Sequence, residues 1–106
     1  MILLKYNIAE KLNNSKPELQ VTDDFVIVIN NSFKAVLKMQ EELSSDKYKS
    51  DIERMTATLN CLLKKEDVKR IESMDLSFTD YLTIVQYIIA LATGQSVEDI
   101  QERFQE

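Results

Sequence analysis

The sequence FVIVI at residues 25–29 is followed at once by NNS at residues 30–32 and by FKAVL at residues 33–37. Successive side chains of a β-strand point to opposite faces of a sheet, so a strand with one exposed face alternates apolar and polar residues. The five apolar residues do not alternate, and they therefore predict a strand buried on both faces. In a chain of 106 residues, the cover must come from its own helices or from a second copy.

The composition is that of a soluble globular protein, and we expect a single domain over residues 1–106. Hydrophobic residues make up 44% of the chain and charged residues 29%, as in ordinary folded domains of this size. The formal net charge is −5, from 18 acidic and 13 basic residues, and the basic residues form no cluster. Because binding to a phosphate backbone usually needs a basic stripe, nucleic acid is not an expected partner.

Three residue counts argue against an enzyme: the chain has no His, one Gly (Gly94) and one Cys (Cys61). It lacks the usual acid/base group at neutral pH, and it cannot build a glycine-rich phosphate loop, a disulfide or a cysteine zinc site. The carboxylates Glu41, Glu42 and Asp67 fall on helix faces expected to be solvated. We therefore expect no catalytic residue, cofactor or metal, and we expect Cys61 to be a small apolar residue on a helix.

Neither a secretory signal nor a membrane span is expected. The apolar residues 1–4 (MILL) are followed by Lys5, which stops them far short of a signal sequence. The longest uncharged stretch, residues 81–97, is shorter and more polar than the roughly 20 residues that a transmembrane helix needs. Since a lone cysteine suits a reducing compartment, we expect the protein in the cytoplasm and no membrane as partner.

Turn residues organise the first part of the chain, residues 1–31, into strands. A short strand at residues 2–6 and a helical turn at residues 8–12 are predicted ahead of a linker that contains Pro17. Residues 18–21 and 25–29 are predicted to form a β-hairpin around a turn at residues 22–24. The turn explains the pair Asp23 and Asp24 better than a cation site does, because a calcium loop needs further oxygen ligands and a glycine.

The second part of the chain, residues 32–106, is predicted to be helical from its N-cap residues and apolar periodicity. The predicted helices span residues 32–43, 51–63, 66–74, 78–93 and 96–104. The face of the first helix expected to be buried carries Phe33, Val36, Leu37, Gln40 and Leu43. In the second helix the expected buried residues are Ile52, Met55, Leu59 and Leu62 or Leu63. The predicted fold class is α+β and mostly helical, with an N-terminal β-hairpin followed by about five helices packed as a small bundle.

The helix at residues 78–93 is more apolar than contact with one core requires. One stripe carries Phe78, Tyr81, Leu82, Val85, Ile88, Ile89 and Ala92. A second stripe beside it carries Ile84, Tyr87 and Leu91, which leaves Thr79, Thr83, Gln86, Ala90 and Thr93 for solvent. Together the stripes cover roughly 220° at roughly 100° per residue, whereas one core-facing side takes roughly 100°. Either this helix is central in the bundle, or the second stripe is an interface with another chain.

Two parts of the sequence resemble a known family. The N-terminal part is KPELQVTDDFVIVINNSFKAVL at residues 16–37, and the C-terminal part consists of LSFTDYL at 76–82, ALATG at 90–94 and IQERF at 100–104. These hydrophobic and capping patterns are similar to those of the small tail assembly chaperones of long-tailed bacteriophages and prophages. The stretch from residue 44 to residue 72 has no such likeness.

The resemblance implies a non-enzymatic protein that self-associates, often as rings or spirals, and coats the tape measure protein. It would keep this long helical protein soluble in the host cytoplasm until the tail tube polymerises, and it is then not expected in the mature virion. A longer, frameshifted form would contact the tail tube protein. The family carries no catalytic residues, so the contact residues come from the physical argument above. They are Phe25, Ile27 and Ile29 of the strand and Ile84, Tyr87 and Leu91 of the second stripe.

Two other classes of function stay open at this point. A small cytoplasmic adaptor or regulatory module, acting as a monomer or dimer on one protein partner, has the same sequence features and would differ in stoichiometry. A helical DNA-binding regulator would need a recognition helix with basic or amide side chains aimed outward. Only residues 64–70 (KKEDVKR) offer one, and their acidic residues weaken it.

Overall fold

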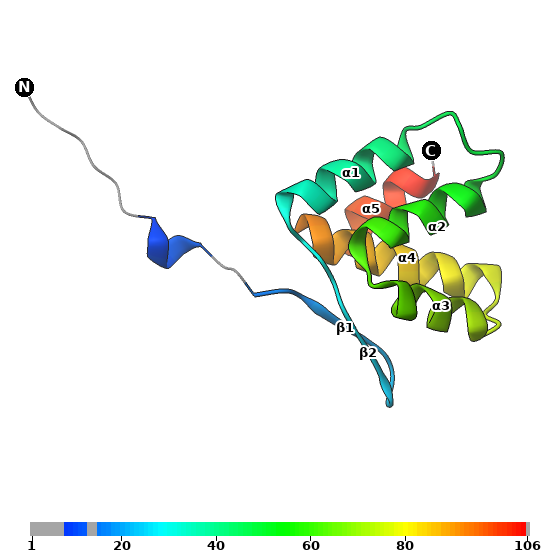
Figure 1. Cartoon of the computed structure of the whole chain (residues 1–106), viewed down its shortest axis with the longest axis horizontal. Coiled ribbons are helices and arrows are strands. Elements are labelled where there is room, and N and C mark those ends of the chain that lie inside the picture. Colours follow the sequence, from blue (N-terminus) through cyan, green and yellow to red (C-terminus); the bar gives the residue numbers. More distant parts are fainter. Residues whose placement is uncertain (1–7, 13–14, 106) are drawn as a thin grey trace, which may run out of the picture.

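The structure is a computed structural model that describes residues 8–12 and 15–105, and its fold class is α+β, mostly helical. The described elements are a short 3₁₀-helix η1 (Ala9–Lys11), the strands β1 (Glu18–Thr22) and β2 (Phe25–Val28), and the helices α1 (Phe33–Leu43), α2 (Asp51–Leu62), α3 (Lys65–Ser73), α4 (Phe78–Thr93) and α5 (Val97–Gln105) (Figure 1). The predicted hairpin and helices are confirmed, with each helix end within one residue of its prediction. The strand predicted at residues 2–6 lies outside the described residues.

Serine side chains determine where four of the described α-helices begin. The hydroxyl oxygens of Ser32, Ser50, Ser77 and Ser96 each accept a hydrogen bond from the backbone N–H three residues later, at 3.1–3.2 Å. Each bond satisfies a donor that would otherwise have no partner in the first turn. Helix α4 ends at Gly94, whose φ of +73° is a left-handed conformation that glycine adopts without steric cost.

The two strands form an antiparallel hairpin with a tighter turn than predicted. Thr22 pairs with Phe25, so the connection consists of Asp23 and Asp24 alone. The register shifts between Gln20 and Thr22, which places Val21 in a β-bulge. The two aspartates therefore serve turn geometry, as expected.

The prediction that residues 25–29 are covered on both faces is wrong for the single chain. Phe25, Ile27 and Ile29 are 2%, 0% and 0% exposed, whereas Val26 and Val28 are 46% and 40% exposed. The reason is that the hairpin has two strands and the helices pack against only one of its faces. The other face leaves two valines uncovered, although the sequence there is as apolar as on the buried face.

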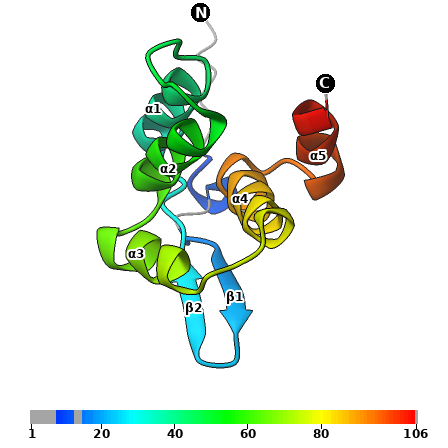
Figure 2. The ribbon, with the colours of Figure 1, turned by 90° about the vertical axis from the view of Figure 1, so that its right-hand side faces the viewer.

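Contacts from two helices hold the hairpin in this orientation. The guanidinium group of Arg70 in α3 lies 4.1 Å from the centre of the Phe25 ring and donates a hydrogen bond to the Asp24 carbonyl at 3.3 Å. At the other end of β2, the N–H of Asn30 donates to the carbonyl of Leu62, the last residue of α2, at 2.8 Å. Figure 2 shows α3 beside β2, with β1 on the far side of the hairpin.

Helix α1 packs against α2, and its buried face overlaps the predicted one in part, since Val36 and Leu43 pack against the core as expected. Ala35 and Met39 are buried, while Phe33 is 78% exposed and Leu37 44% exposed. The apolar residues of this helix span roughly 200° at roughly 100° per residue, so periodicity alone could not choose the buried side. The small Ala35 lies on the buried side, and the larger Phe33 is left outside.

Helix α4 is in contact with α2, α5 and β1, and most of its C-terminal half is buried. Val85, Ile88, Ile89 and Ala92 of the first stripe are buried. Gln86 and Ala90, predicted to face solvent, are 7% and 3% exposed, and this part of the prediction is wrong. Neighbouring elements cover Gln86 and Ala90, and the periodicity of one helix does not show where such neighbours lie.

Contacts of Tyr48 and Lys47 with Glu42 hold the loop between α1 and α2 against the end of α1. The hydroxyl of Tyr48 donates a hydrogen bond to the carboxylate of Glu42, and the ammonium group of Lys47 lies 3.5 Å from the same carboxylate. The hydrogen bond from Tyr48 lowers the pKa of Glu42 by more than desolvation raises it, and the charge of Lys47 lowers this pKa further. Arg54 of α2 adds a hydrogen bond to the carbonyl of Ser45 at 3.2 Å.

Replacing Tyr48 with phenylalanine is expected to raise the pKa of Glu42 towards its ordinary value, because the phenol no longer stabilises the ionised carboxylate. Since the folded-state pKa of Glu42 is lowered, its contribution to stability is present above the unfolded pKa and is lost as the pH falls through the folded pKa. The variant should lose this part of the acid dependence of unfolding. An NMR titration of the Glu42 carboxyl carbon in both proteins measures the shift, and an unchanged pKa would contradict the assignment.

Candidate protein-interaction surface

The six predicted contact residues fall into two groups in the structure. Phe25, Ile27 and Ile29 are buried in the core of the chain itself, so they offer no surface to a partner while the hairpin stays in place. The uncovered side chains of this strand are those of Val26 and Val28. The second stripe, by contrast, is on the surface: Tyr87 is 40% exposed, and Ile84 and Leu91 are half-buried at the edge of the core.

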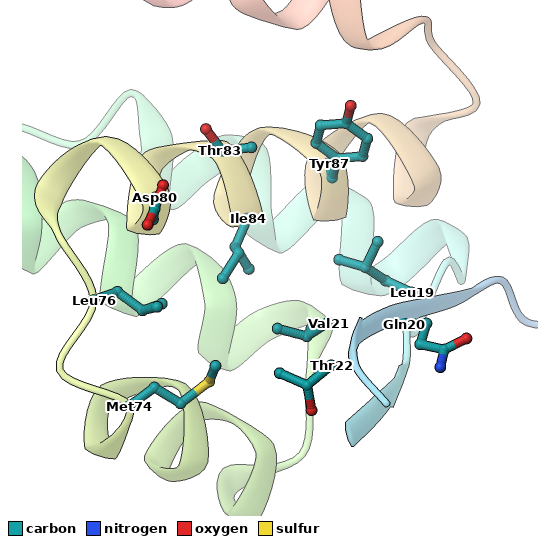
Figure 3. A pocket seen from close by; sticks show the side chains of 10 residues that line it. All are labelled: Leu19, Gln20, Val21, Thr22, Met74, Leu76, Asp80, Thr83, Ile84 and Tyr87. Carbon is teal, nitrogen blue, oxygen red and sulfur yellow. The ribbon is translucent and has the colours of Figure 1, made fainter. Parts of the chain in front are cut away.

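An open hollow of about 400 Å³ lies between β1 and α4, and two of the predicted residues line it. Its lining residues are Leu19, Gln20, Val21, Thr22, Met74, Leu76, Asp80, Thr83, Ile84 and Tyr87. Figure 3 shows the side chains of Ile84, Leu76, Met74 and Val21 directed into the space, with Tyr87 above Leu19 at one end. The hollow is thus formed by β1, by α4 and by the segment between α3 and α4.

The chemistry of this hollow suits apolar side chains of another polypeptide. Of the ten lining residues that the structure describes, Asp80 alone carries a charge, and it lies in the first turn of α4, where a carboxylate is favoured by the helix dipole. Uncovered apolar surface with a few polar groups at its border is typical of sites for protein partners.

The free edge of β1 borders the same hollow. Four consecutive residues of the strand line it, and consecutive residues point to opposite faces, so the hollow meets the edge of the strand as well as one face. The N–H of Ile29 donates to the carbonyl of Pro17. Leu19, two residues further along, lies opposite Ile27, so its backbone groups also point towards β2. The backbone groups of Glu18 and Gln20 therefore point away from β2. Within the described chain, no backbone hydrogen bond joins this edge to another segment.

A second hollow of about 380 Å³ continues the apolar surface on the other side of Leu76, which lines both. It lies where α2, α3 and α4 meet, and its lining includes Ile52 and Phe78, which are 54% and 56% exposed. Both residues were assigned to buried stripes in the sequence. They lie in the first turns of their helices, where an apolar stripe can extend beyond the edge of the core. This position at the helix start was the one feature of the sequence that could have indicated their exposure.

No group of three or more His, Cys, Asp or Glu residues that could hold a metal ion occurs in residues 8–12 and 15–105. Burial raises the pKa of the Cys61 thiol, which disfavours the nucleophilic thiolate, and the thiol donates to the carbonyl of Ala57. The described helices are each too short or too polar to cross a bilayer.

Comparison with known proteins found no family model that matches the chain, and no similar curated protein or solved structure. The likeness to tail assembly chaperones thus rests on the sequence patterns at residues 16–37 and 76–104 alone.

Proposed function

We propose that the chain is a non-enzymatic tail assembly chaperone of a long-tailed phage or prophage. It self-associates in the host cytoplasm and coats the tape measure protein before the tail tube polymerises, and it is absent from the mature virion. The tail tube protein is contacted through a longer form of the chaperone. The proposal joins the sequence resemblance to one structural observation, which is the amount of apolar surface that the chain leaves uncovered.

The uncovered surface is spread over several places, as a coat requires. It includes the hollow beside β1, the adjoining hollow at Leu76, the outer valines of β2 and the exposed Phe33 of α1. A coat must hold strongly as a whole and weakly at each contact, so that tube subunits can displace it. Several modest apolar patches on many copies satisfy this requirement better than one tight site, and the net charge of −5 keeps free copies apart by repulsion.

The proposal predicts concentration-dependent assembly. The molar mass, measured by size-exclusion chromatography with light scattering over a hundredfold range of concentration, should rise well above the 12.3 kDa of one chain. Co-expression should also keep the tape measure protein of the same genome in the soluble fraction. A monomer at every concentration that leaves the tape measure protein insoluble would contradict the proposal and favour an adaptor that binds a single partner.

A further inference from the structure

The described residues ahead of β1 are directed away from the rest of the protein. Figure 1 shows the described residues 8–12 and 15–17 running outward from the hairpin, on the side opposite to the helices. Ile8 and Leu12 on this segment are 53% and 60% exposed. Apolar side chains held away from their own core are suited to contact with another molecule.

The sequence of residues 2–8, ILLKYNI, has the pattern of a strand with one apolar face. Ile2, Leu4, Tyr6 and Ile8 follow one another at every second position, which is the period of a β-strand. Two of the three residues between them, Lys5 and Asn7, are polar. A strand with one apolar face needs a sheet edge for its backbone and a hydrophobic surface for its side chains.

The free edge of β1 offers both at the same place. Its outward backbone groups have no backbone partner among the described residues and can bond an added strand. The apolar side chains of Val21 and Ile84 line the hollow next to this edge, and Leu76 lines its opposite side (Figure 3). Addition of an extended segment to an exposed sheet edge is a common mode of peptide recognition, in which alternate side chains enter neighbouring pockets.

The charges of the two parts are complementary. Residues 1–16 hold three Lys and one Glu, which gives them a formal charge of +2. Because the whole chain carries −5, the remaining residues carry −7. The hollow itself contains Asp80 and adjoins Glu18 at the start of β1. Such complementarity speeds encounter and orients the segment, although exposed charges add little affinity.

We propose that residues 2–6 of one copy, which precede η1, add as a strand to the free edge of β1 in a second copy, with Ile2, Leu4 and Tyr6 facing the hollow. The described residues 8–12 and 15–17 lie away from the hollow of their own chain in Figure 1, which makes a second copy the occupant. This inference rests on the self-association in the proposed function, and it names the contact that produces it.

The contact joins two different surfaces, so each copy offers one segment and one hollow. Contacts of this kind link copies head to tail and continue until the series closes into a ring or grows as an open spiral. Blocking either surface alone should therefore stop growth, and each blocked chain should still have one functional surface left.

Full-length variants test the two surfaces separately. Leu4→Glu places a carboxylate on the apolar face of the segment, and Tyr87→Glu places one at the hollow, so each should raise the concentration needed for assembly at least tenfold. Leu3→Glu is the matched control, because Leu3 lies on the opposite face of the added strand, and it should assemble like the unchanged chain. Ile84→Glu serves as a second hollow variant, and circular dichroism checks that every variant is folded.

Mixing the two blocked chains gives the decisive result. An equimolar mixture of Leu4→Glu and Tyr87→Glu should form dimers and stop there, because the intact segment of one chain fits the intact hollow of the other. Light scattering distinguishes a mass of two chains from that of one chain or of larger assemblies.

Two outcomes would overturn the inference. If Leu4→Glu assembles as readily as Leu3→Glu, another surface carries self-association, and the proposed function stands without this contact. If both blocked chains are monomers and their mixture stays monomeric, the segment does not bind the hollow of a second copy. A failure of the proposed function would differ from both, since the unchanged chain would then be monomeric throughout.

Discussion

Replacing Ile27 with alanine is expected to lower the free energy of unfolding by about 2–5 kcal/mol, the usual cost of truncating a buried isoleucine. Ile27 is 0% exposed and lies in β2, between the hairpin and the helices. Loss of its side chain leaves a cavity at the junction of the two parts of the fold. Urea unfolding followed by circular dichroism measures the change, and it should be done at low protein concentration to avoid assembly.

Val26→Ala is the matched control, because Val26 is the next residue of the same strand and points to the other face. With 46% of Val26 exposed, the loss should stay below about 1 kcal/mol, the range of strand propensities. If the two variants lose equal stability at low concentration, the outer face of the hairpin must be covered within a single chain. That result would contradict the orientation of the hairpin described above.

The two neighbouring residues also show why the hairpin was predicted correctly and its environment was not. Turn residues and the apolar run at 25–29 determine that a strand forms there. The number of strands in the sheet, and hence whether helices lie on one face or both, depends on the rest of the chain. Val26 and Val28 are as apolar as Ile27, so local sequence could not show that they would be exposed.

Helix ends could likewise be predicted from local sequence, whereas the buried faces of helices could not. A helix begins where a nearby side chain satisfies its first N–H groups, and this information is local, so Ser32, Ser50, Ser77 and Ser96 predicted four starts correctly. The buried face depends on packing against other helices. In α1 the apolar arc was wide enough to allow two choices, and the side that carries Ala35 and Met39 is the buried one.

The candidate surface was predicted in part. The surplus of apolar residues on α4 indicated Ile84, Tyr87 and Leu91, because residues on one helix stand in a known angular relation. The hollow that Ile84 and Tyr87 border also needs Leu19, Met74 and Leu76. These residues come from β1 and from the segment between α3 and α4, and no local pattern in the sequence brings them together.

Replacing Ile84 with glutamate is expected to raise the concentration needed for self-association at least tenfold, equivalent to about 1.4 kcal/mol or more per contact. Ile84 lies half-buried at the centre of the hollow, where a partner would have to cover the new carboxylate. Burying an unpaired charge costs more than the contact gains from the isoleucine. Light scattering over a dilution series, compared with that of the unchanged chain, gives the shift.

Thr79→Glu adds the same charge to the same helix and separates a local effect from a general one. Thr79 is exposed and does not line the hollow, so this variant should assemble like the unchanged chain. If both variants weaken assembly equally, net repulsion between copies explains the loss, and the hollow is not the contact. Urea unfolding of both variants shows whether each is folded.

Ile84→Glu should retain a folded core, because Val85, Ile88 and Ile89 still anchor α4. A loss of assembly in this folded chain then identifies the hollow as the contact surface.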